Sequence, residues 1–257
     1  MSGIRVLAYP ADTVYIYDGS YDGFLCCVYE SVYRRELPSE IWREDAAPLT
    51  VLETRFIKTD GERAARVAKS IPQKISRRAH ELVNTVFLSC LEQKELKILT
   101  FLLRGYNEGE RLAYMLGDED IAVLLDAEKR LLHEAHLFTG FVRFSDVGGA
   151  LVSTISPKNY VLPFIANHFL QRCRAENFMI FDKTNKAALI YQSGAASIIS
   201  VDSIEFPEVT ESEVRYRELW KRFYDAIAIE SRIKPCCRMT HMPKRYWADM
   251  IEVQDLL

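Results

Sequence analysis

The residues best suited to chemistry gather near the C-terminal end of the sequence. Residues 232–247 contain five lysines and arginines and no acid, and two large aromatic residues close the run. Cations neutralise phosphates and aromatic rings stack on bases, so this combination is typical of a nucleic-acid contact. The alternative is a structural latch in which the tryptophan is buried. The expected phosphate-binding residues are Arg238, Lys244 and Arg245, and the expected stacking residues are Tyr246 and Trp247.

A second group of cations lies in the middle of the sequence. Arg143 stands between two phenylalanines on an expected strand, where a guanidinium can stack on rings or reach a phosphate. His168 and Arg172 are four residues apart on an expected helix and therefore share a face. If that helix packs near the strand, Arg143 and Arg172 could converge on one anion. The alternative is a salt bridge to Asp182 or Glu176.

Three residues are candidates for general acid–base catalysis, namely His136, His168 and Asp182. Excision of a base needs a carboxylate or imidazole positioned near the sugar. His133 and His136 share a helix face, but no carboxylate at matching spacing supports a metal site. We therefore expect no metal there and interpret this pair as packed or hydrogen-bonded histidines, with proton handling as the alternative.

Motifs for several enzyme classes are missing from the sequence. It contains neither a phosphate-binding loop nor a dinucleotide fingerprint, and it has no nucleophile elbow. Cys26-Cys27 and Cys236-Cys237 are vicinal pairs without the C-x-x-C spacing of a zinc or redox site, and Pro235-Cys236-Cys237 fails the deaminase pattern. The first pair lies in an apolar run, so packing explains it better. No cofactor is expected.

Composition and charge indicate a folded protein with segregated charge. The 257 residues are 49% hydrophobic and 27% charged, and the net charge is −3. Residues 55–78 hold eight bases and two acids, a local charge of +6, and a polyanion could dock on such a face. The alternative is a solvated helix face whose bases pair with acids. Neither a signal peptide nor a membrane span is recognisable, so we expect a cytoplasmic protein without membrane contact.

Local patterns predict an α+β fold with a mainly antiparallel sheet built from hairpins. Residues 61–139 read almost wholly as helix, and Pro72 is expected in the first turn of one helix. Because no linker is visible, we expect a single domain over residues 1–257 with a mostly helical subdomain at about 61–139. Strands are expected at 13–17, 50–58, 141–144, 150–155, 178–181, 187–191 and 196–201, and further helices from Ser20, at 160–174, at 211–232 and from Pro243.

Segments along nearly the whole chain resemble a bacterial family of uncharacterised function that is described as a probable DNA metabolism or repair protein. The opening motif lies at Tyr15–Val28, and the central signature H-x-x-x-x-F-V-R-F lies at His136–Phe144. The next helix, Pro157–Arg172, and the late helix, Leu219–Arg232, are also similar to the family. The C-terminal signature is Met242–Trp247, the most specific of these segments.

The resemblance implies an association with DNA-modifying proteins, and it implies no specific activity. Family members are encoded beside a radical-SAM protein assigned to DNA modification or repair, and related domains are fused to uracil-DNA-glycosylase-like domains. This chain lacks the C-x-x-x-C-x-x-C motif and is therefore not the radical-SAM partner itself. The first hypothesis is a non-catalytic DNA-binding accessory protein. The alternatives are an enzyme acting on damaged or modified bases, and a protein–protein adaptor that does not touch nucleic acid.

Overall fold

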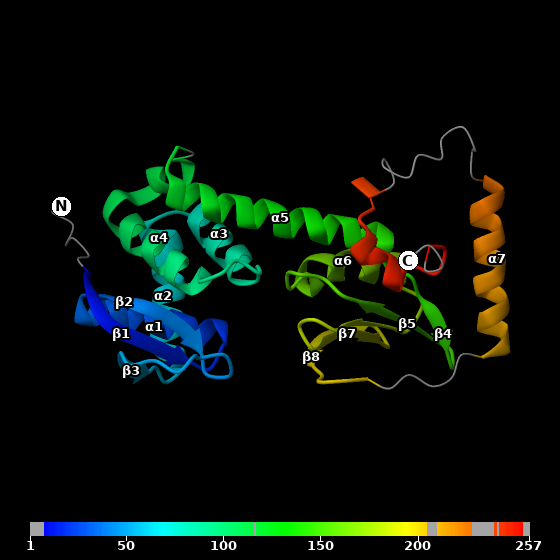
Figure 1. Ribbon diagram of the computed structural model, residues 1–257, viewed down its shortest axis with the longest axis horizontal. Helices are drawn as coiled ribbons and strands as arrows, with labels where there is room; N and C mark the ends of the chain where they lie inside the picture. Colours follow the sequence, from blue (N-terminus) through cyan, green and yellow to red (C-terminus); the bar gives the residue numbers. More distant parts are fainter. Residues whose placement is uncertain (1–7, 116, 205–209, 228–238, 241, 254–257) are drawn as a thin grey trace. The chain divides into compact units, whose positions relative to one another are not determined.

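The computed structural model describes residues 8–115, 117–204, 210–227, 239–240 and 242–253 (Figure 1). The chain divides into two compact units, residues 1–131 and 132–257, and each unit has its own hydrophobic core. Both contain helices and strands, so the predicted α+β class is confirmed. The prediction of a single domain stays a prediction. Among the described residues, no helix combines the length and the apolar run that a membrane span requires.

The first unit is built on a three-stranded parallel sheet with strand order β2-β1-β3 (Figure 1). Helix α1 connects the neighbouring strands β1 and β2, and helices α1 and α4 contact this sheet. The elements are β1 (Tyr9–Tyr17), α1 (Tyr21–Arg34), β2 (Glu36–Arg43), β3 (Glu53–Phe56), α2 (Gly61–Lys74), α3 (Arg77–Phe87), α4 (Lys94–Glu108), the 3-10 helix η1 (Gly109–Tyr114) and α5 (Glu119–Phe141), which continues into the second unit.

Side chains cap the first turns of α1 and α2. The Ser20 hydroxyl accepts a hydrogen bond from the Gly23 amide at 2.9 Å and starts α1. Asp60 accepts from the amides of Glu62 and Arg63 and starts α2. Each cap satisfies donors that the first helical turn leaves unpaired. The two caps place the first turns of α1 and α2 directly after β1 and β3.

Three expectations for the first unit need correction. Strand β2 was not predicted, and its pairing with β1 makes this sheet parallel rather than antiparallel. The predicted strand at 50–58 shortens to Glu53–Phe56. Pro72 lies near the end of α2 rather than in a first turn. The helix ends at Lys74, two residues later.

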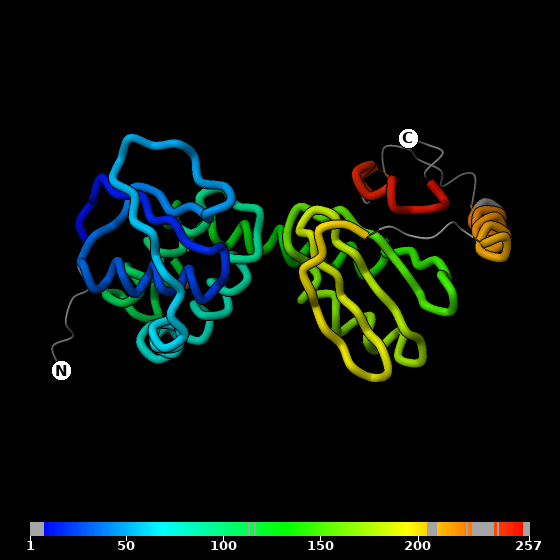
Figure 2. Tube along the Cα trace, turned by 90° about the horizontal axis from the view of Figure 1, so that it is seen from below, coloured from blue at the N-terminus to red at the C-terminus, as the bar shows by residue number. Residues whose placement is uncertain are grey.

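The second unit holds a five-stranded sheet of order β4-β5-β6-β7-β8. Within this sheet the β5–β6 pair is parallel, and α6 connects those two strands; the other pairs are antiparallel, as expected from the hairpins. The chain of this sheet runs from green to yellow in Figure 2. Gly148 and Gly149 adopt φ of 62° and 85° in the predicted first hairpin turn. The elements are β4 (Ser145–Val147), β5 (Ala150–Ile155), α6 (Leu162–Arg172), β6 (Phe178–Asp182), β7 (Ala187–Gln192), β8 (Ala195–Ser200), α7 (Glu211–Ile227) and the 3-10 helix η3 (Lys244–Asp249).

The predicted strand at 141–144 is wrong. Helix α5 extends to Phe141, and the sheet begins only at Ser145. The amide of Val142 still donates to the Phe138 carbonyl at 3.2 Å, so the helical hydrogen bonding runs past the end of α5. Residues 228–232 of the expected late helix lie outside the described residues. The predicted helix after Pro243 is present as η3.

Candidate functional sites

The strand order of the parallel sheet indicates where a ligand would bind. From β1 the chain passes through α1 to β2 on one side, and it then crosses to β3 on the other side of β1. In open α/β sheets ligands bind outside the carboxyl ends of the strands, at the point where the connections change direction. In this unit that point lies between the ends of β1 and β3.

A pocket of about 450 Å³ lies at this point, and we call it the switch-point pocket. Its size falls within the range of ~300–1,000 Å³ that is usual for small-molecule sites. The Phe56 ring at its wall is 69% exposed, an unusual position for a large aromatic residue. The lining residues are Ile16, Tyr17, Asp18, Glu44, Phe56, Ile57, Lys58 and Thr59.

Asp18 is held rigidly at the edge of this pocket. Its Oδ1 accepts hydrogen bonds from the Ser20 amide at 2.9 Å and the Ser20 hydroxyl at 2.6 Å. Its Oδ2 accepts from the Thr59 hydroxyl at 2.7 Å. Partial burial opposes ionisation, but these hydrogen bonds outweigh it and lower the pKa of Asp18. The carboxylate is therefore charged and fixed at neutral pH.

Gly23 makes this arrangement possible because it has no side chain. A Cβ atom at this position would stand 2.2 Å from Asp18 Oδ1 and 2.8 Å from Thr59 Oγ1. Both distances are shorter than real contacts of a methyl group. The glycine thus lets the first turn of α1 approach the Asp18–Thr59 hydrogen bond directly.

A basic and aromatic surface covers the outer sides of α1 and α2. The rings of Tyr29 and Tyr33 lie nearly parallel, at 8°, with 6.2 Å between centroids, and Tyr33 is 74% exposed. The guanidinium carbons of Arg63 and Arg66 lie 5.2 and 5.7 Å from the Tyr29 ring centroid. Lys69 follows Arg66 one helical turn later and is exposed. We call these five residues the α1–α2 face.

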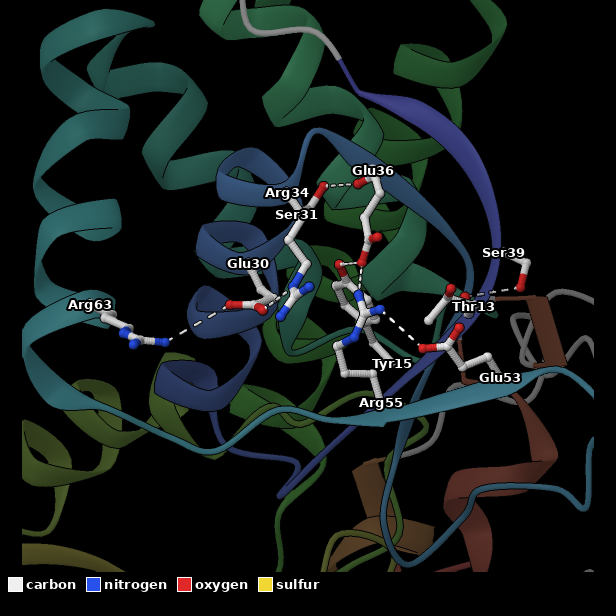
Figure 3. A network of polar contacts seen from close by, with 10 residues as sticks. All are labelled: Thr13, Tyr15, Glu30, Ser31, Arg34, Glu36, Ser39, Glu53, Arg55 and Arg63. Carbon is white, nitrogen blue, oxygen red and sulfur yellow. Dashed lines mark hydrogen bonds and ion pairs between the residues drawn. The ribbon is translucent and has the colours of Figure 1, made fainter.

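Acids neutralise only part of the basic run that the sequence shows at residues 55–78. Arg55 contacts Glu36, which also accepts from Tyr15, and Arg63 shares Glu30 with Arg34 (Figure 3). Arg77 and Arg78 pair with Glu81 and Glu128. Arg66 and Lys69 have no ion pair within the part of the chain that the structure describes. Part of this run is therefore a face whose bases pair with acids. Two cations of the α1–α2 face, Arg66 and Lys69, stay available to bind a polyanion.

The aromatic residues of the C-terminal signature are buried. Tyr246 is 2% and Trp247 5% exposed, and Tyr246 packs against Phe138 and Phe141 at centroid distances of 5.1 Å. The Trp247 indole donates to the Met242 carbonyl at 2.8 Å. Neither ring can stack on a base in this arrangement. The structure has the latch that was the alternative interpretation of this segment.

The arginines near this latch are paired with buried carboxylates. Arg245 lies 3.0 Å from a Glu134 oxygen, and Arg143 lies 2.5 Å from a Glu252 oxygen. The two acids are 3% and 2% exposed at their side chains. Burial opposes ionisation of Glu252, but the Arg143 hydrogen bonds outweigh it and lower its pKa. These cations neutralise internal charge in this arrangement, and the phosphate contacts expected of them stay a prediction.

The structure brings the remaining predicted residues into no common site. Within the described ranges, no hydrogen bond or ion pair joins His136, His168 and Asp182. The two histidines are exposed on α5 and α6. Asp182 is fully buried and accepts from the Thr184 and Asn185 amides, so it shapes the turn after β6, and burial raises its pKa.

The remaining predicted cations are exposed or lie outside the described residues. Arg172 and Lys244 are exposed, and the Lys244 amine lies 5.5 Å from the Trp247 ring centroid. Arg238 is the one that falls outside the described ranges. Among the residues that the structure describes there is no group of three or more histidines, cysteines and carboxylates that could hold a metal ion.

Sequence reasoning missed the switch-point pocket and the tyrosines of the α1–α2 face. Tyr29 and Tyr33 stand four residues apart on a predicted helix, so their shared face was readable. The pocket could not be predicted from the sequence. It depends on strand β2, which was not predicted, and whose parallel pairing with β1 makes the connections between strands change direction.

Comparison with known proteins identifies the family. The model of a family described as a domain of unknown function, DUF4130, matches residues 92–252. No curated protein and no solved structure matches the chain. The switch-point pocket and the α1–α2 face both precede the matched region, whereas the latch lies within it. Because the match covers more than half of its length, the chain belongs to the DUF4130 family.

Proposed function

We propose that the protein is a DNA-binding accessory protein that holds unpaired bases of DNA on the α1–α2 face. The supporting observation is the combination of Arg66 and Lys69, two cations without acidic partners among the described residues, with the exposed ring of Tyr33. Cations track the phosphates and the ring stacks on a base, which is how single strands are commonly bound. This surface replaces the C-terminal signature as the place of contact.

We propose binding of unpaired bases because the exposed Tyr33 ring needs a base with a free face. The outer face of Tyr33 can stack only on a base that has left its own stack, because duplex bases cover one another. A duplex offers the same phosphates to Arg66 and Lys69 but nothing to Tyr33. Single-stranded DNA is therefore expected to bind more tightly than duplex DNA of the same sequence.

The proposed partner is a radical-SAM protein that acts on DNA, and this part rests on the family resemblance. A surface that suits a protein partner is present on α7. The side chains of Tyr216, Leu219 and Phe223 are 67%, 50% and 52% exposed, and Ile227 continues the same apolar side. Exposed apolar patches of this kind are typical of protein interfaces. Replacing Phe223 with Glu is expected to abolish co-purification with that partner after nuclease treatment.

Salt dependence provides the test of DNA binding. Fluorescence anisotropy with labelled single strands should show saturable binding, and the affinity should fall as salt rises from about 50 to about 200 mM. Arg66→Ala/Lys69→Ala should flatten the slope of log K against log salt by about 1.4, since each phosphate contributes about 0.7 on a single strand.

A matched variant distinguishes this surface from charge in general. Arg77→Ala/Arg130→Ala also removes two arginines, which are 90% and 77% exposed and lie on α3 and α5. That variant should keep the wild-type slope. If both double variants lost affinity equally, or if wild type bound no DNA at low salt, the proposed function would be wrong.

A further inference from the structure

The switch-point pocket shares no residue with the α1–α2 face. Its chemistry suits a base rather than a phosphate. We propose that it binds a single nucleobase that carries an exocyclic amino group, that is adenine, cytosine or guanine. The inference deepens the proposed function and rests on it only for the source of the base. It depends on the polarity of the pocket, on its aromatic wall and on the fixed Asp18 carboxylate at its edge.

The charge of the pocket disfavours a phosphate and favours a ligand that donates hydrogen bonds. Two carboxylates, Asp18 and Glu44, line it against one cation, Lys58, so its formal charge is negative. An ionised carboxylate offers about four acceptor positions, and Asp18 uses three of them. Asp18 and Glu44 are both exposed, and as carboxylates they suit a ligand that donates hydrogen bonds.

The aromatic and apolar wall requires a flat ligand. The exposed ring of Phe56 stands beside Ile16 and Ile57 in the lining. An aromatic ring with one free face stacks on any planar heterocycle. Stacking on Phe56 favours any base. The carboxylates then favour bases that carry an amino group, because a carboxylate accepts hydrogen bonds. Adenine and cytosine present an amino group, whereas thymine presents a carbonyl oxygen at that position.

The Asp18 carboxylate at the edge of the pocket is already in its binding geometry. The Thr59 hydroxyl and the Ser20 hydroxyl fix the Asp18 carboxylate, and the missing side chain of Gly23 leaves room for that arrangement. A site that needs no rearrangement loses less affinity to ordering. A carboxylate held in one orientation also discriminates between a donor and an acceptor on the ligand.

Free nucleosides test the pocket without any contribution from the α1–α2 face. Adenosine and cytidine should shift the amide NMR signals of residues 17–18 and 56–59 in a saturable manner, and thymidine should bind about tenfold more weakly. Phe56→Ala should weaken adenosine binding by about tenfold, because it removes the ring on which the base stacks. Tyr9→Ala, which removes a similarly exposed ring from the start of β1, should leave it unchanged.

The two proposals fail in different ways. Arg66→Ala/Lys69→Ala should weaken binding of oligonucleotides and leave adenosine binding intact, whereas Phe56→Ala should weaken adenosine binding and leave binding of thymine oligonucleotides intact. Equal binding of thymidine and adenosine, equal effects of Phe56→Ala and Tyr9→Ala, or no saturable nucleoside binding would each overturn the pocket assignment. Oligonucleotide binding that persists in any of those cases would leave the proposed function standing.

Discussion

At the scale of single residues, Trp247 shows how a recognition signal and a packing signal can coincide. Its ring is buried beside Met242, and its neighbour Tyr246 fills the space between Phe138 and Phe141. We expect Trp247→Ala to lower the free energy of unfolding by about 3–5 kcal/mol, as for other large buried side chains. Urea denaturation measures this, and single-strand DNA affinity below the transition should stay at the wild-type value.

Loss of DNA binding without loss of stability would contradict the structural role of Trp247. A variant that kept wild-type stability but lost DNA binding would place Trp247 on the DNA rather than in the core. Tyr33→Ala is the comparison, because its side chain is 74% exposed. That variant should lose DNA affinity with little change in stability.

The Arg143–Glu252 pair predicts how stability depends on pH. The pKa of Glu252 in the folded protein lies below its ordinary value of 4.5, so the unfolded state binds more protons in acid. The stabilisation from this carboxylate is therefore present above about pH 4.5 and is lost as the pH falls through the folded pKa. Glu252→Gln lacks this titration.

Unfolding measured at several pH values checks the sign. The stability difference between wild type and Glu252→Gln should be largest near neutral pH and should shrink below about pH 4.5. A difference that stayed constant, or that grew in acid, would show that Arg143 does not hold the carboxylate ionised.

At the scale of elements, Gly23 tests the junction of β1, α1 and β3. Gly23→Ala should destabilise the protein by about 1–3 kcal/mol, because the new methyl group collides with a fixed hydrogen bond and not with a flexible chain end. Gly140→Ala is the control, since Gly140 lies inside α5 and a methyl group there would meet no described atom within 4 Å outside its own helix backbone. That change should be neutral or stabilising by about 0.5–1 kcal/mol.

Thermal unfolding of both variants and adenosine binding by Gly23→Ala complete this test. Equal stability of the two variants would show that the first turn of α1 can move away from Asp18. The Asp18 carboxylate would then not be held in one orientation, and the pocket would not discriminate between donors and acceptors on a ligand.

Local sequence patterns predicted most helices and strands. They failed where contacts with distant residues determine the structure. The Gly148-Gly149 turn and the strands that follow it were readable because the turn chemistry is local. Strand β2 was not readable, since Glu36–Arg43 mixes charged residues with a proline and gains its pairing only from β1. The burial of Trp247 was left open for the same reason: charge spacing does not report which distant side chains cover a ring.

At the scale of the whole molecule, the two cores are expected to respond separately to mutation. Leu99 on α4 and Ile165 on α6 are both fully buried, each in a different core. Each change to alanine should cost about 2–5 kcal/mol. Hydrogen exchange should show the loss of protection within the unit that carries the change, and equal loss in both units would indicate one cooperative body.

We expect the first unit to contact DNA through α1 and α2. Hydrogen exchange of the full chain, with and without saturating single-stranded DNA, measures this contact. We predict slower exchange on DNA binding at residues 29–34 and 61–74, with no change at residues 242–253. Protection confined to the C-terminal segment, or no protection under conditions where the DNA is bound, would contradict the account.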